Sequence, residues 1–378
     1  MIDMAMRIGL ITTLSTNIGD DFIRTGLRRM VQEVFAGKEI EFVPVNKHEP
    51  YTAYPAWHPV RIAALAKYLP RGKGMAGKLI DALLATPALS KFEDCAAVIQ
   101  CGAPVLWPGC HQCEWAGPLW RRIVGRLREC IPVFNLAAGS CYPWERQPTT
   151  VEDRADAKFL TAIHGYCRLT TVRDRLSRQL FDSLGCAVSH IPCSALLAAD
   201  EPGSSSNGDG TVLINYMPGG GHYDFGQGVN GSNWHNTVRG LVARLRRRHR
   251  VAFLCHNETE LNAASSVADG LPCHLPKSVA EYFAVASEAK AGIFNRMHAS
   301  VGLAGMGIPS IAVGTDTRLL MVEHIGLPCF YVKDARLEQL EEKLEGLLLN
   351  RAQEKERLMG LRRDTMRSYV EAVSHAWS

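Results

Sequence analysis

Residues 7–35 read RIGLITTLSTNIGDDFIRTGLRRMVQEVF, and the prediction of the fold starts from this segment. Its first part, residues 7–13, is a short apolar run, which predicts a buried strand. A polar loop that contains Gly19 follows, and residues 21–35 then place apolar side chains at helical spacing. Strand, loop and helix in this order form the repeating unit of parallel α/β sheets.

The same alternation continues along the rest of the chain, on both sides of a polar segment at residues 199–210. Before that segment, strands are predicted at residues 40–45, 96–101, 131–136, 168–172 and 187–191, with helices at 115–128 and 174–184. After it, strands are predicted at 211–215, 251–255, 291–294 and 309–313, with helices at 234–248, 258–267, 279–287 and 299–306 and long helical sequence from 334 almost to the end. We therefore predict an α/β protein with two Rossmann-like domains that face each other across a cleft.

The segment at residues 199–210, ADEPGSSSNGDG, has the composition of a flexible linker. We place the domain boundary here. The expected division is an N-terminal α/β domain at 1–200, a C-terminal α/β domain at 211–350, and a C-terminal helix at 351–378 that packs back on the first domain. We expect the first domain to be the acceptor side of the site and the second the donor side.

The amino-acid composition argues against a membrane-spanning protein and gives no indication of a nucleic-acid-binding one. The chain has 378 residues, of which 47% are hydrophobic and 21% charged, and its apolar runs are far shorter than the roughly 18 to 20 residues of a membrane-spanning helix. The start of the chain reads as a strand rather than a signal peptide, so we expect a cytoplasmic protein. A net charge of +4 does not imply nucleic acid as a partner.

Three motifs with known chemistry are incomplete in this sequence. Residues 72–78, GKGMAGK, match a P-loop up to the lysine, but Leu79 replaces the Ser or Thr that would hold magnesium. A dinucleotide-binding Gly-x-Gly-x-x-Gly after a strand is absent. Cys110 and Cys113 form a Cys-x-x-Cys pair without the second close pair that a structural zinc site normally has. We expect neither a cofactor nor a metal.

Candidate ligand-binding residues remain at three places where a predicted strand gives way to a loop or helix. After the first strand, Asn17-Ile-Gly19-Asp20 combines a tight turn with the unpaired backbone N–H groups of a helix start. Arg173 ends the strand predicted at 168–172. Arg296 and His298 follow the strand predicted at 291–294 and place an anion-binding fork and a proton donor at one point.

Together these places resemble the polysaccharide pyruvyl transferase family. The resemblance rests on Asn17-Ile-Gly-Asp20, on Val172-Arg173-Asp174 with Ser177, and on Arg296-Met-His298 followed by Gly307-Ile-Pro309, and it extends from residue 7 to about residue 327. It implies a GT-B-like architecture and the transfer of pyruvate from phosphoenolpyruvate to a sugar of a cell-surface polysaccharide, or to its lipid-linked precursor, as a ketal.

The resemblance also implies roles for individual residues. Phosphoenolpyruvate carries a phosphate and a carboxylate, and the planar fork of arginine suits both. The expected donor-binding residues are Arg173, Arg296 and Arg318. His298 is the expected general acid, with Asp20 accepting a hydroxyl proton. Acceptor binding is expected at Asn17, Gly19 and Gly102.

Two other functions remain open at this stage. One is a GT-B-type glycosyltransferase in which Arg296 would hold the diphosphate of a nucleotide sugar, since a fold does not determine chemistry. The other is a sugar-binding protein without catalysis. It is favoured by two departures from the family pattern, Pro192-Cys193-Ser194-Ala195 and Gln100-Cys101-Gly102-Ala103-Pro104. The sequence does not identify the acceptor sugar or the oligomeric state.

Overall fold

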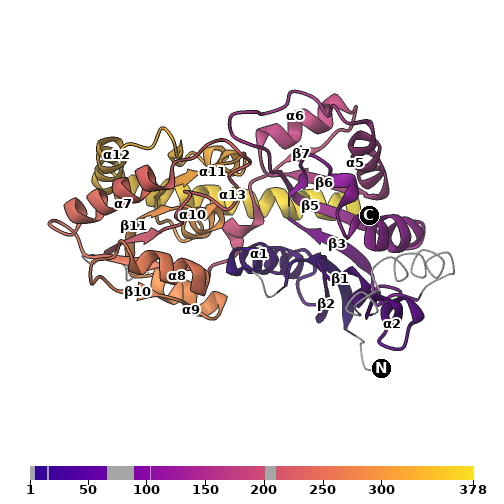
Figure 1. The fold of residues 1–378 in the computed structure, drawn as a ribbon. Coiled ribbons are helices and arrows are strands. Elements are labelled where there is room, and N and C mark those ends of the chain that lie inside the picture. Colours follow the sequence, from indigo (N-terminus) through magenta and orange to yellow (C-terminus); the bar gives the residue numbers. More distant parts are fainter. Residues whose placement is uncertain (1–4, 15–16, 66–88, 103, 201–209) are drawn as a thin grey trace.

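Two parallel sheets form the framework of the chain (Figure 1). The computed structural model describes residues 5–14, 17–65, 89–102, 104–200 and 210–378. The N-terminal sheet has the strand order β2-β1-β3-β5-β6-β7, with β4 beside β5, and the C-terminal sheet has the order β10-β9-β8-β11-β12-β13. Within the two sheets, the described strands pair in parallel throughout, as the alternation of strands and helices predicts.

The strands of the N-terminal sheet are β1 Met6–Thr12, β2 Ile40–Asn46, β3 Ala97–Cys101, β4 Pro104–Leu106, β5 Val133–Ser140, β6 Leu169–Val172 and β7 Ser189–His190. Its helices are α1 Ile18–Val34, α2 Pro59–Leu65, α4 Gly125–Leu127, α5 Arg154–Tyr166 and α6 Arg175–Ser183. Short 3-10 helices lie at η1 Pro50–Ala53, η3 Cys110–Gln112 and η5 Ser194–Leu197.

The strands of the C-terminal sheet are β8 Thr211–Asn215, β9 Val251–Leu254, β10 Cys273–His274, β11 Ala289–Phe294, β12 Ser310–Gly314 and β13 Cys329–Tyr331. Its helices are α7 Gly231–Leu245, α8 Glu258–Ser265, α9 Val279–Ala286, α10 Met297–Ala304, α11 Leu319–His324 and α12 Leu337–Leu349. The last helix, α13, spans Arg351–Trp377.

Two predicted helices differ from the observed ones for local reasons. The helix expected at residues 115–128 is a π-helix, η4 Ala116–Val124, followed by the single turn α4. Pro118 lies in its first turn and has no backbone N–H to donate to a helical bond, and the N–H of Trp120 reaches back five residues to the carbonyl of Trp115. The helical sequence expected from residue 334 is divided at Asn350 into α12 and α13.

One apolar core extends through both sheets. It includes Phe22 of α1, which packs its ring 4.8 Å from those of Tyr282 and Phe283 beside the C-terminal sheet. The 3-10 helix η5 lies between α1 and α10. A Cβ atom at Gly26 of α1 would lie 1.8 Å from the carbonyl oxygen of Ser194, so glycine is required for this close packing.

A second connection joins the sheets at the ends of β5 and β12. Pro143 and Asp316 form an isolated antiparallel bridge. The backbone N–H of Tyr142 donates to Oγ1 of Thr317 over 2.9 Å, and the N–H of Thr317 donates to the carbonyl of Tyr142 over 3.0 Å. The hydroxyl of Ser140 lies 2.9 Å from that of Thr317. We call this group, Ser140–Tyr142 with Asp316 and Thr317, the inter-sheet clamp.

The last helix crosses from one half of the molecule to the other. In Figure 1 the yellow α13 runs from the C-terminal half to the side of β5 and β6, where the chain ends. The ring of Trp377 stacks on Phe134 at 5.7 Å and meets the edge of Phe35 at 4.6 Å. The hydroxyl of Tyr369 donates to the carbonyl of Pro192 over 2.9 Å. The predicted domain boundaries stay a prediction, and the linker segment 201–209 lies outside the described residues.

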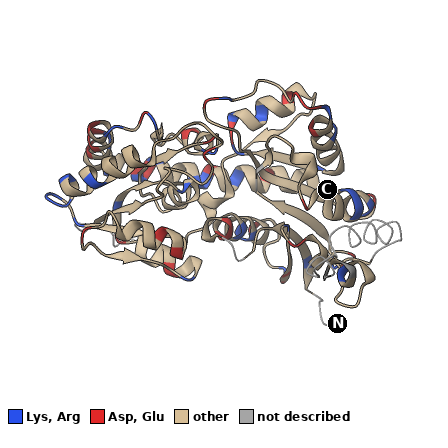
Figure 2. Cartoon of the chain, in the orientation of Figure 1, with Lys and Arg blue, Asp and Glu red and all other residues tan. Residues whose placement is uncertain are grey.

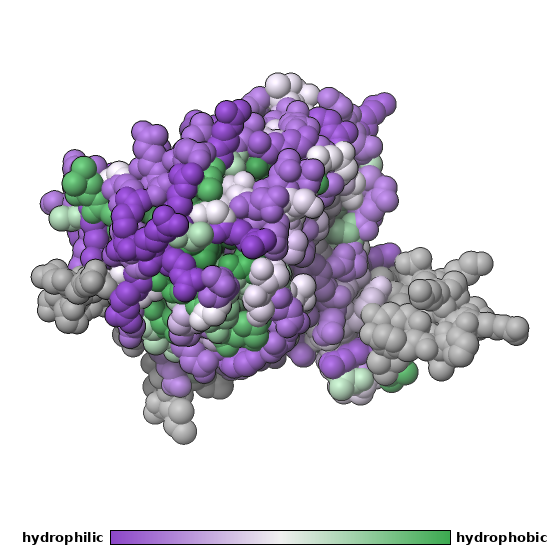
Figure 3. Space-filling view, turned by 60° about the vertical axis from the view of Figure 1, so that its left-hand side comes forward, coloured by the Kyte–Doolittle hydropathy of each residue, from purple (hydrophilic) through white to green (hydrophobic). Residues whose placement is uncertain are grey.

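Charged and apolar residues are mixed in the two views of the described residues in Figures 2 and 3. Residues of both charges are scattered over the helices of both halves (Figure 2). The face shown in Figure 3 is largely hydrophilic, with apolar residues in small patches. Among the described residues, no helix combines the length and apolar character needed to cross a bilayer.

Candidate active site

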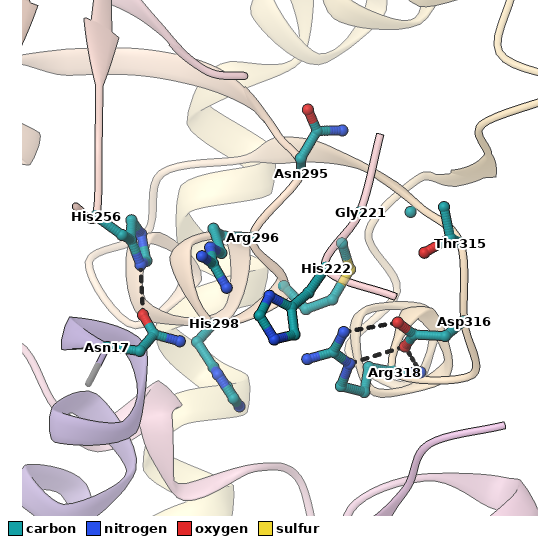
Figure 4. A pocket seen from close by; sticks show the side chains of 12 residues that line it. Asn17, Gly221, His222, His256, Asn295, Arg296, His298, Thr315, Asp316 and Arg318 are labelled. Carbon is teal, nitrogen blue, oxygen red and sulfur yellow. Dashed lines mark hydrogen bonds and ion pairs between the residues drawn. The ribbon is translucent and has the colours of Figure 1, made fainter. Parts of the chain in front are cut away.

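A pocket opens at the carboxyl ends of β8, β9, β11 and β12, the edge where parallel α/β sheets usually bind ligands (Figure 4). Asn17 from the start of α1 borders it from the N-terminal half. The other lining residues come from loops and helix starts of the C-terminal half: Gly221, His222, His256, Asn295, Arg296, Met297, His298, Gly314, Thr315, Asp316 and Arg318. Four of the predicted site residues therefore meet here: Asn17, Arg296, His298 and Arg318.

Arg296 is anchored by a buried carboxylate. Its Nε and Nη2 atoms both lie 2.6 Å from Oε1 of Glu260, which is 3% exposed. Glu260 also accepts the side chain of Asn215 over 2.7 Å and the backbone N–H of His256 over 2.9 Å. Burial raises the pKa of Glu260, but His256, Arg296 and these hydrogen bonds outweigh burial and hold the pKa below its usual value. Glu260 therefore balances the charge of Arg296.

Arg318 is paired in the same manner. Its Nε donates to Oδ1 of Asp316 over 2.8 Å and its Nη2 to Oδ2 over 2.6 Å, a bidentate contact within one loop. Burial lowers the pKa of the guanidinium, but Asp316 more than offsets this and raises it. In Figure 4, His222 lies between Arg296 and Arg318. Burial, with a smaller contribution from these two arginines, lowers the pKa of His222.

His298 occupies the first turn of α10 and is 9% exposed. Its Nε2 atom lies 3.2 Å from Nη1 of Arg173, which comes from the other sheet. Because a guanidinium can only donate hydrogen bonds, Nε2 must present its lone pair and the imidazole must be neutral. Burial, followed by the charge of Arg173, holds the pKa of His298 well below its usual value. The two halves of the molecule thus meet at this contact.

Arg173 follows β6 and is 1% exposed. Its Nη1 atom faces His298, the carbonyl of Gly102 at 3.5 Å and Sγ of Cys193 at 3.7 Å. Within the described part of the chain, its Nε and Nη2 atoms have no hydrogen-bond partner and no carboxylate pairs with it. A Cβ atom at Gly139 would lie 2.4 Å from Nε, so glycine provides the space that this side chain occupies. Arg173 is a buried cation without a counter-ion.

The loop after β1 contacts the same site. Asn17 caps α1 by accepting the N–H of Gly19 over 3.0 Å, and its Oδ1 lies 3.1 Å from Nδ1 of His256. A Cβ atom at Gly19 would lie 3.1 Å from that of His298, so glycine allows the close approach. Burial raises the pKa of Asp20, an effect that Lys47, Arg173 and Arg318 partly offset. Ser15 and Thr16 of this loop lie outside the described residues.

Of the predicted acceptor-binding residues, Asn17 lines the pocket, whereas Gly19 and Gly102 are not among its lining residues. A Cβ atom at Gly102 would meet Ile23 at 2.9 Å and Ala137 at 3.0 Å, which are apolar neighbours in the core. Its contribution to the site is the carbonyl oxygen that faces Nη1 of Arg173.

Four residues of this region were not predicted from the sequence: Lys47, His256, Glu260 and Asp316. A usable signal existed for Lys47 and His256, because each comes at or just beyond the end of a strand, where the sheet edge begins. Asp316 follows β12 by two residues. Glu260 lies inside the first turn of α8 and has the sequence appearance of an ordinary helix-start acid, so no local signal distinguishes it.

In the cysteine-rich segment, the carboxylate of Asp156 holds the turn around Cys110. Asp156 accepts the backbone N–H groups of Gly109 over 2.8 Å and His111 over 3.0 Å, the thiol of Cys110 over 3.3 Å, and lies 2.6 Å from Nδ1 of His111. His111, Asp153 and Asp156 are close enough to share a metal ion. These hydrogen bonds already occupy Asp156 as the anchor of the turn at η3. The P-loop-like residues 72–78 lie outside the described residues.

Several solved structures have a fold similar to that of this chain. The UDP-GlcNAc 2-epimerase from Neisseria meningitidis bound to UDP-GlcNAc has a TM-score of 0.54 at 11% identity, covering 97% of this chain and 99% of that one. The S. aureus MnaA–UDP co-structure has a TM-score of 0.51 at 11% identity, covering 94% and 91%. The E. coli heptosyltransferase WaaC with ADP has a TM-score of 0.45 at 15% identity, covering 90% and 99%. The first two structures, with TM-scores above 0.5, show that the chain has the GT-B-like fold of two Rossmann-like units, as the sequence predicts.

The sequence comparison is more specific about the family. Polysaccharide pyruvyl transferase is the family whose sequence model matches residues 17–317. The chain belongs to this family, which confirms the resemblance drawn from its motifs. The match begins at Asn17 and ends at Thr317, so it includes the inter-sheet clamp and every pocket-lining residue except Arg318, which follows its last residue. Among curated proteins, none matches this chain.

Proposed function

We propose that the protein transfers pyruvate from phosphoenolpyruvate to two hydroxyl groups of a saccharide, forming a ketal. The observation that supports this most is the contact of Arg173 with His298. It joins a buried cation without a counter-ion to a neutral histidine, at the edge of a pocket that holds Arg296 and Arg318. Such a site is prepared for a small ligand that brings negative charge and then needs a proton.

The arginines match the two anionic groups of this donor. Arg296 and Arg318 use Nε and Nη2 on their own carboxylates, which fixes both guanidinium planes and leaves each Nη1 without a hydrogen bond among the described residues. The start of α10 adds backbone N–H groups at the same place, with no side-chain cap on that terminus. A phosphate or carboxylate group in the pocket would pair with these donors.

Arg173 gives His298 a way to change its protonation state. A bound anion attracts the Arg173 guanidinium away from Nε2 of His298 and adds negative charge nearby, and both effects raise the pKa of the imidazole. The imidazolium then protonates the methylene carbon of the donor, which becomes the methyl group of the product. Positive character develops on the central carbon, where the first saccharide hydroxyl attacks.

The remaining steps balance without a cofactor. The first hydroxyl forms a carbon–oxygen bond and gives its proton to Asp20. The bond between the central carbon and the phosphate oxygen then breaks, the second hydroxyl closes the ketal, and phosphate leaves. Of the two hydroxyl protons released, one replaces the proton donated by His298 and the other leaves with phosphate. The acceptor is a saccharide with two suitably placed hydroxyls, either free or lipid-linked.

Ligand-induced thermal stabilisation tests this proposal directly. Phosphoenolpyruvate should raise the melting temperature of the protein in a concentration-dependent manner, whereas a panel of nucleotide sugars should not, because only a ligand of the native state stabilises it. Arg296→Lys should weaken the effect, since an ammonium cannot form two parallel hydrogen bonds, and the exposed Arg239→Lys should leave it unchanged. Stabilisation by a nucleotide sugar alone would favour a glycosyltransferase instead.

A further inference from the structure

Lys47 lies at the same sheet edge as the site but was not predicted from the sequence. It directly follows β2, and its backbone N–H donates to the carbonyl of Thr12 at the end of β1 over 2.8 Å. Asn17–Asp20 follow β1 and Arg173 follows β6 at this carboxyl edge. Lys47 is therefore held at the end of β2, next to Asn17–Asp20 after β1, whereas Arg173 lies at the end of β6, three strands further along the same edge. The charges of both Lys47 and Arg173 act on the Asp20 carboxyl group, which connects the two positions.

The side chain of Lys47 is buried without a counter-ion. It is 6% exposed, and among the described residues no hydrogen bond or ion pair within 4 Å reaches its Nζ atom. The ammonium lies 5.8 Å from the centre of the Trp115 ring, a weak contact for a cation. Burial lowers the pKa of Lys47, and Asp20, Cys113 and Glu114 act against this. Glu114 is itself paired with His48.

Charge compensation differs between the two halves of the site. Each arginine of the pocket has its own carboxylate, Glu260 for Arg296 and Asp316 for Arg318. Lys47 and Arg173 have no ion pair with a carboxylate of the described residues. They share Asp20 as an acid that acts on both, and Asp20 also interacts with Arg318. A buried charge is costly unless a partner neutralises it. The uncompensated positive charge of the site therefore lies on the N-terminal sheet, at Lys47 and Arg173.

We propose that Lys47 and Arg173 form a phosphoryl-binding subsite at the carboxyl edge of the N-terminal sheet. Two cations that form no ion pair with the described residues suit a phosphoryl group, which carries more negative charge than a carboxylate, and arginine and lysine both bind phosphoryl groups. The carboxylate of the donor, with one negative charge, then belongs with the compensated arginines of the pocket. This assignment rests on the proposed function, and it moves part of the donor to the half that the sequence predicted as the acceptor side.

A phosphoryl group could reach this subsite from two sources. One is the phosphate of phosphoenolpyruvate, and the other is the phosphate of a phosphorylated or diphosphate-linked saccharide acceptor. The chemistry that Lys47 recognises is the same for both. The experiment therefore compares three probes, which are inorganic phosphate, phosphoenolpyruvate and glucose 1-phosphate.

Calorimetric titration of Lys47→Met against the wild-type protein is the test. The matched control is Lys38→Met, which changes an exposed lysine next to the opposite, amino end of the same strand. We expect the dissociation constant for inorganic phosphate to rise about tenfold or more in Lys47→Met and to stay the same in Lys38→Met, because a charge-assisted hydrogen bond is lost. Lys47→Met should still fold, since it removes an unpaired buried charge, and its melting temperature verifies this. Lys47→Gln provides a second variant of similar length.

The results distinguish a donor phosphate from an acceptor phosphate, and they test the subsite separately from the proposed function. Weaker binding of phosphate and phosphoenolpyruvate in both Lys47 variants supports a donor subsite. Weaker binding of phosphate and glucose 1-phosphate, with phosphoenolpyruvate unchanged, supports an acceptor subsite. Unchanged phosphate affinity in both variants, or no phosphate binding by the wild-type protein, overturns the subsite. Failure of the wild-type protein to bind phosphoenolpyruvate while phosphate binding depends on Lys47 would overturn the proposed function and leave the subsite intact.

Discussion

The contact between Arg173 and His298 sets the chemical state of the free site. With its Nε2 lone pair directed at a guanidinium 3.2 Å away, His298 cannot hold a second proton there. A general acid that is neutral in the free protein must obtain its proton when the ligand binds. Charge on the ligand and protonation of the histidine are therefore linked, and this linkage can be measured.

Binding of phosphoenolpyruvate should be accompanied by proton uptake at neutral pH. The pKa of His298 is well below its usual value in the free site, so the ligand's charges raise it toward the working pH and the complex binds more protons than its components. Calorimetry in two buffers with different ionisation enthalpies gives the number of protons. His298→Gln should lose most of the uptake, and equal uptake by both proteins would rule out this residue as the group that is protonated.

Replacing Arg173 by methionine should stabilise the free protein and abolish the response to the donor. The substitution removes a 1% exposed cation without a counter-ion, and the expected gain in unfolding free energy is about 1 kcal/mol or more. Thermal unfolding with and without phosphoenolpyruvate measures both effects. Arg178→Met, on the exposed face of α6, is the control. A lower melting temperature for Arg173→Met would show that the guanidinium stabilises the fold.

At the level of single residues, the sequence indicated those that belong to family motifs but not the carboxylates that pair with the arginines. Asn17, Arg296 and His298 lie in the loop or first helical turn that follows a strand, where position alone suggests a ligand role. The counter-ion Glu260 depends on which loops meet in space, and this is a property of tertiary structure, whereas Asp316 lies two residues from Arg318 in the same loop. That Arg173 and Lys47 form no ion pair with the described residues is likewise visible only in the tertiary structure.

Among the elements, η5 shows how packing replaces a family motif. Its first two residues, Ser194 and Ala195, end the stretch Pro192–Ala195 where the sequence departs from the family pattern, and its backbone fits against a glycine of α1 and the glycine that follows α10. A Cβ atom at Gly26 of α1 would lie 1.8 Å from the carbonyl of Ser194, and one at Gly305 after α10 would lie 2.1 Å from that of Leu196. The short helix thus fixes α1 against α10, and these two helices carry Asn17 and His298 at their first turns.

Gly26→Ala should destabilise the protein by about 1–3 kcal/mol or more, because neither backbone can move away without repacking. Gly346→Ala, in the interior of α12 where no atom lies within 4 Å of the added methyl group, should stabilise it by about 0.5–1 kcal/mol. Denaturant unfolding of the two variants measures the change in unfolding free energy, which should be negative for the first and positive for the second. Equal effects in the two variants would contradict the packing of η5 against α1.

The contact between β7 and α11 lets us predict how the stability of the protein depends on pH. His190 of β7 and His324 of α11 stack across the two halves with ring centres 3.8 Å apart, near Asp174 and Arg178. Burial lowers the pKa of both, to about 4 for His190. Between that value and the unperturbed value of about 6.5, the unfolded chain binds more protons, so stability is lost as pH falls.

The melting temperature should therefore fall from pH 7 to pH 5, and His190→Phe should make this decrease smaller. Burial also lowers the pKa values of His256 and His298, so part of the decrease in melting temperature should remain in this variant. The substitution His375→Phe, on the exposed end of α13, is the matched control and should change nothing. A decrease of the same size in His190→Phe would mean that the stacked pair does not titrate on unfolding.

Element prediction worked best where a strand was short, apolar and followed by a polar residue. The strands near residues 97, 133 and 251 were placed within a few residues of the observed bounds. The short strands β4, β10 and β13 were missed, because two or three residues do not establish a period. The π-helix η4 was missed because its geometry depends on Pro118 and on packing against buried neighbours.

For the whole molecule, one core through both sheets, the inter-sheet clamp and α13 oppose independent melting of the halves. We expect a single calorimetric transition whose van't Hoff and calorimetric enthalpies agree. A chain that ends at Asn350 loses the contacts of Trp377 with Phe134 and of Tyr369 with Pro192, and should unfold at lower temperature. Two separate transitions in the full chain would show that the shared core does not couple the halves.

The course of α13 also determines when the first sheet can be completed during synthesis. The ribosome releases the chain from the N-terminus, so all strands of this sheet emerge long before residue 377 does. Until then, Phe134 and Phe35 lack the indole that covers them in the finished protein. The nascent N-terminal half therefore carries an open apolar surface while the whole second sheet is being made, and this is the period in which a chaperone would be needed most.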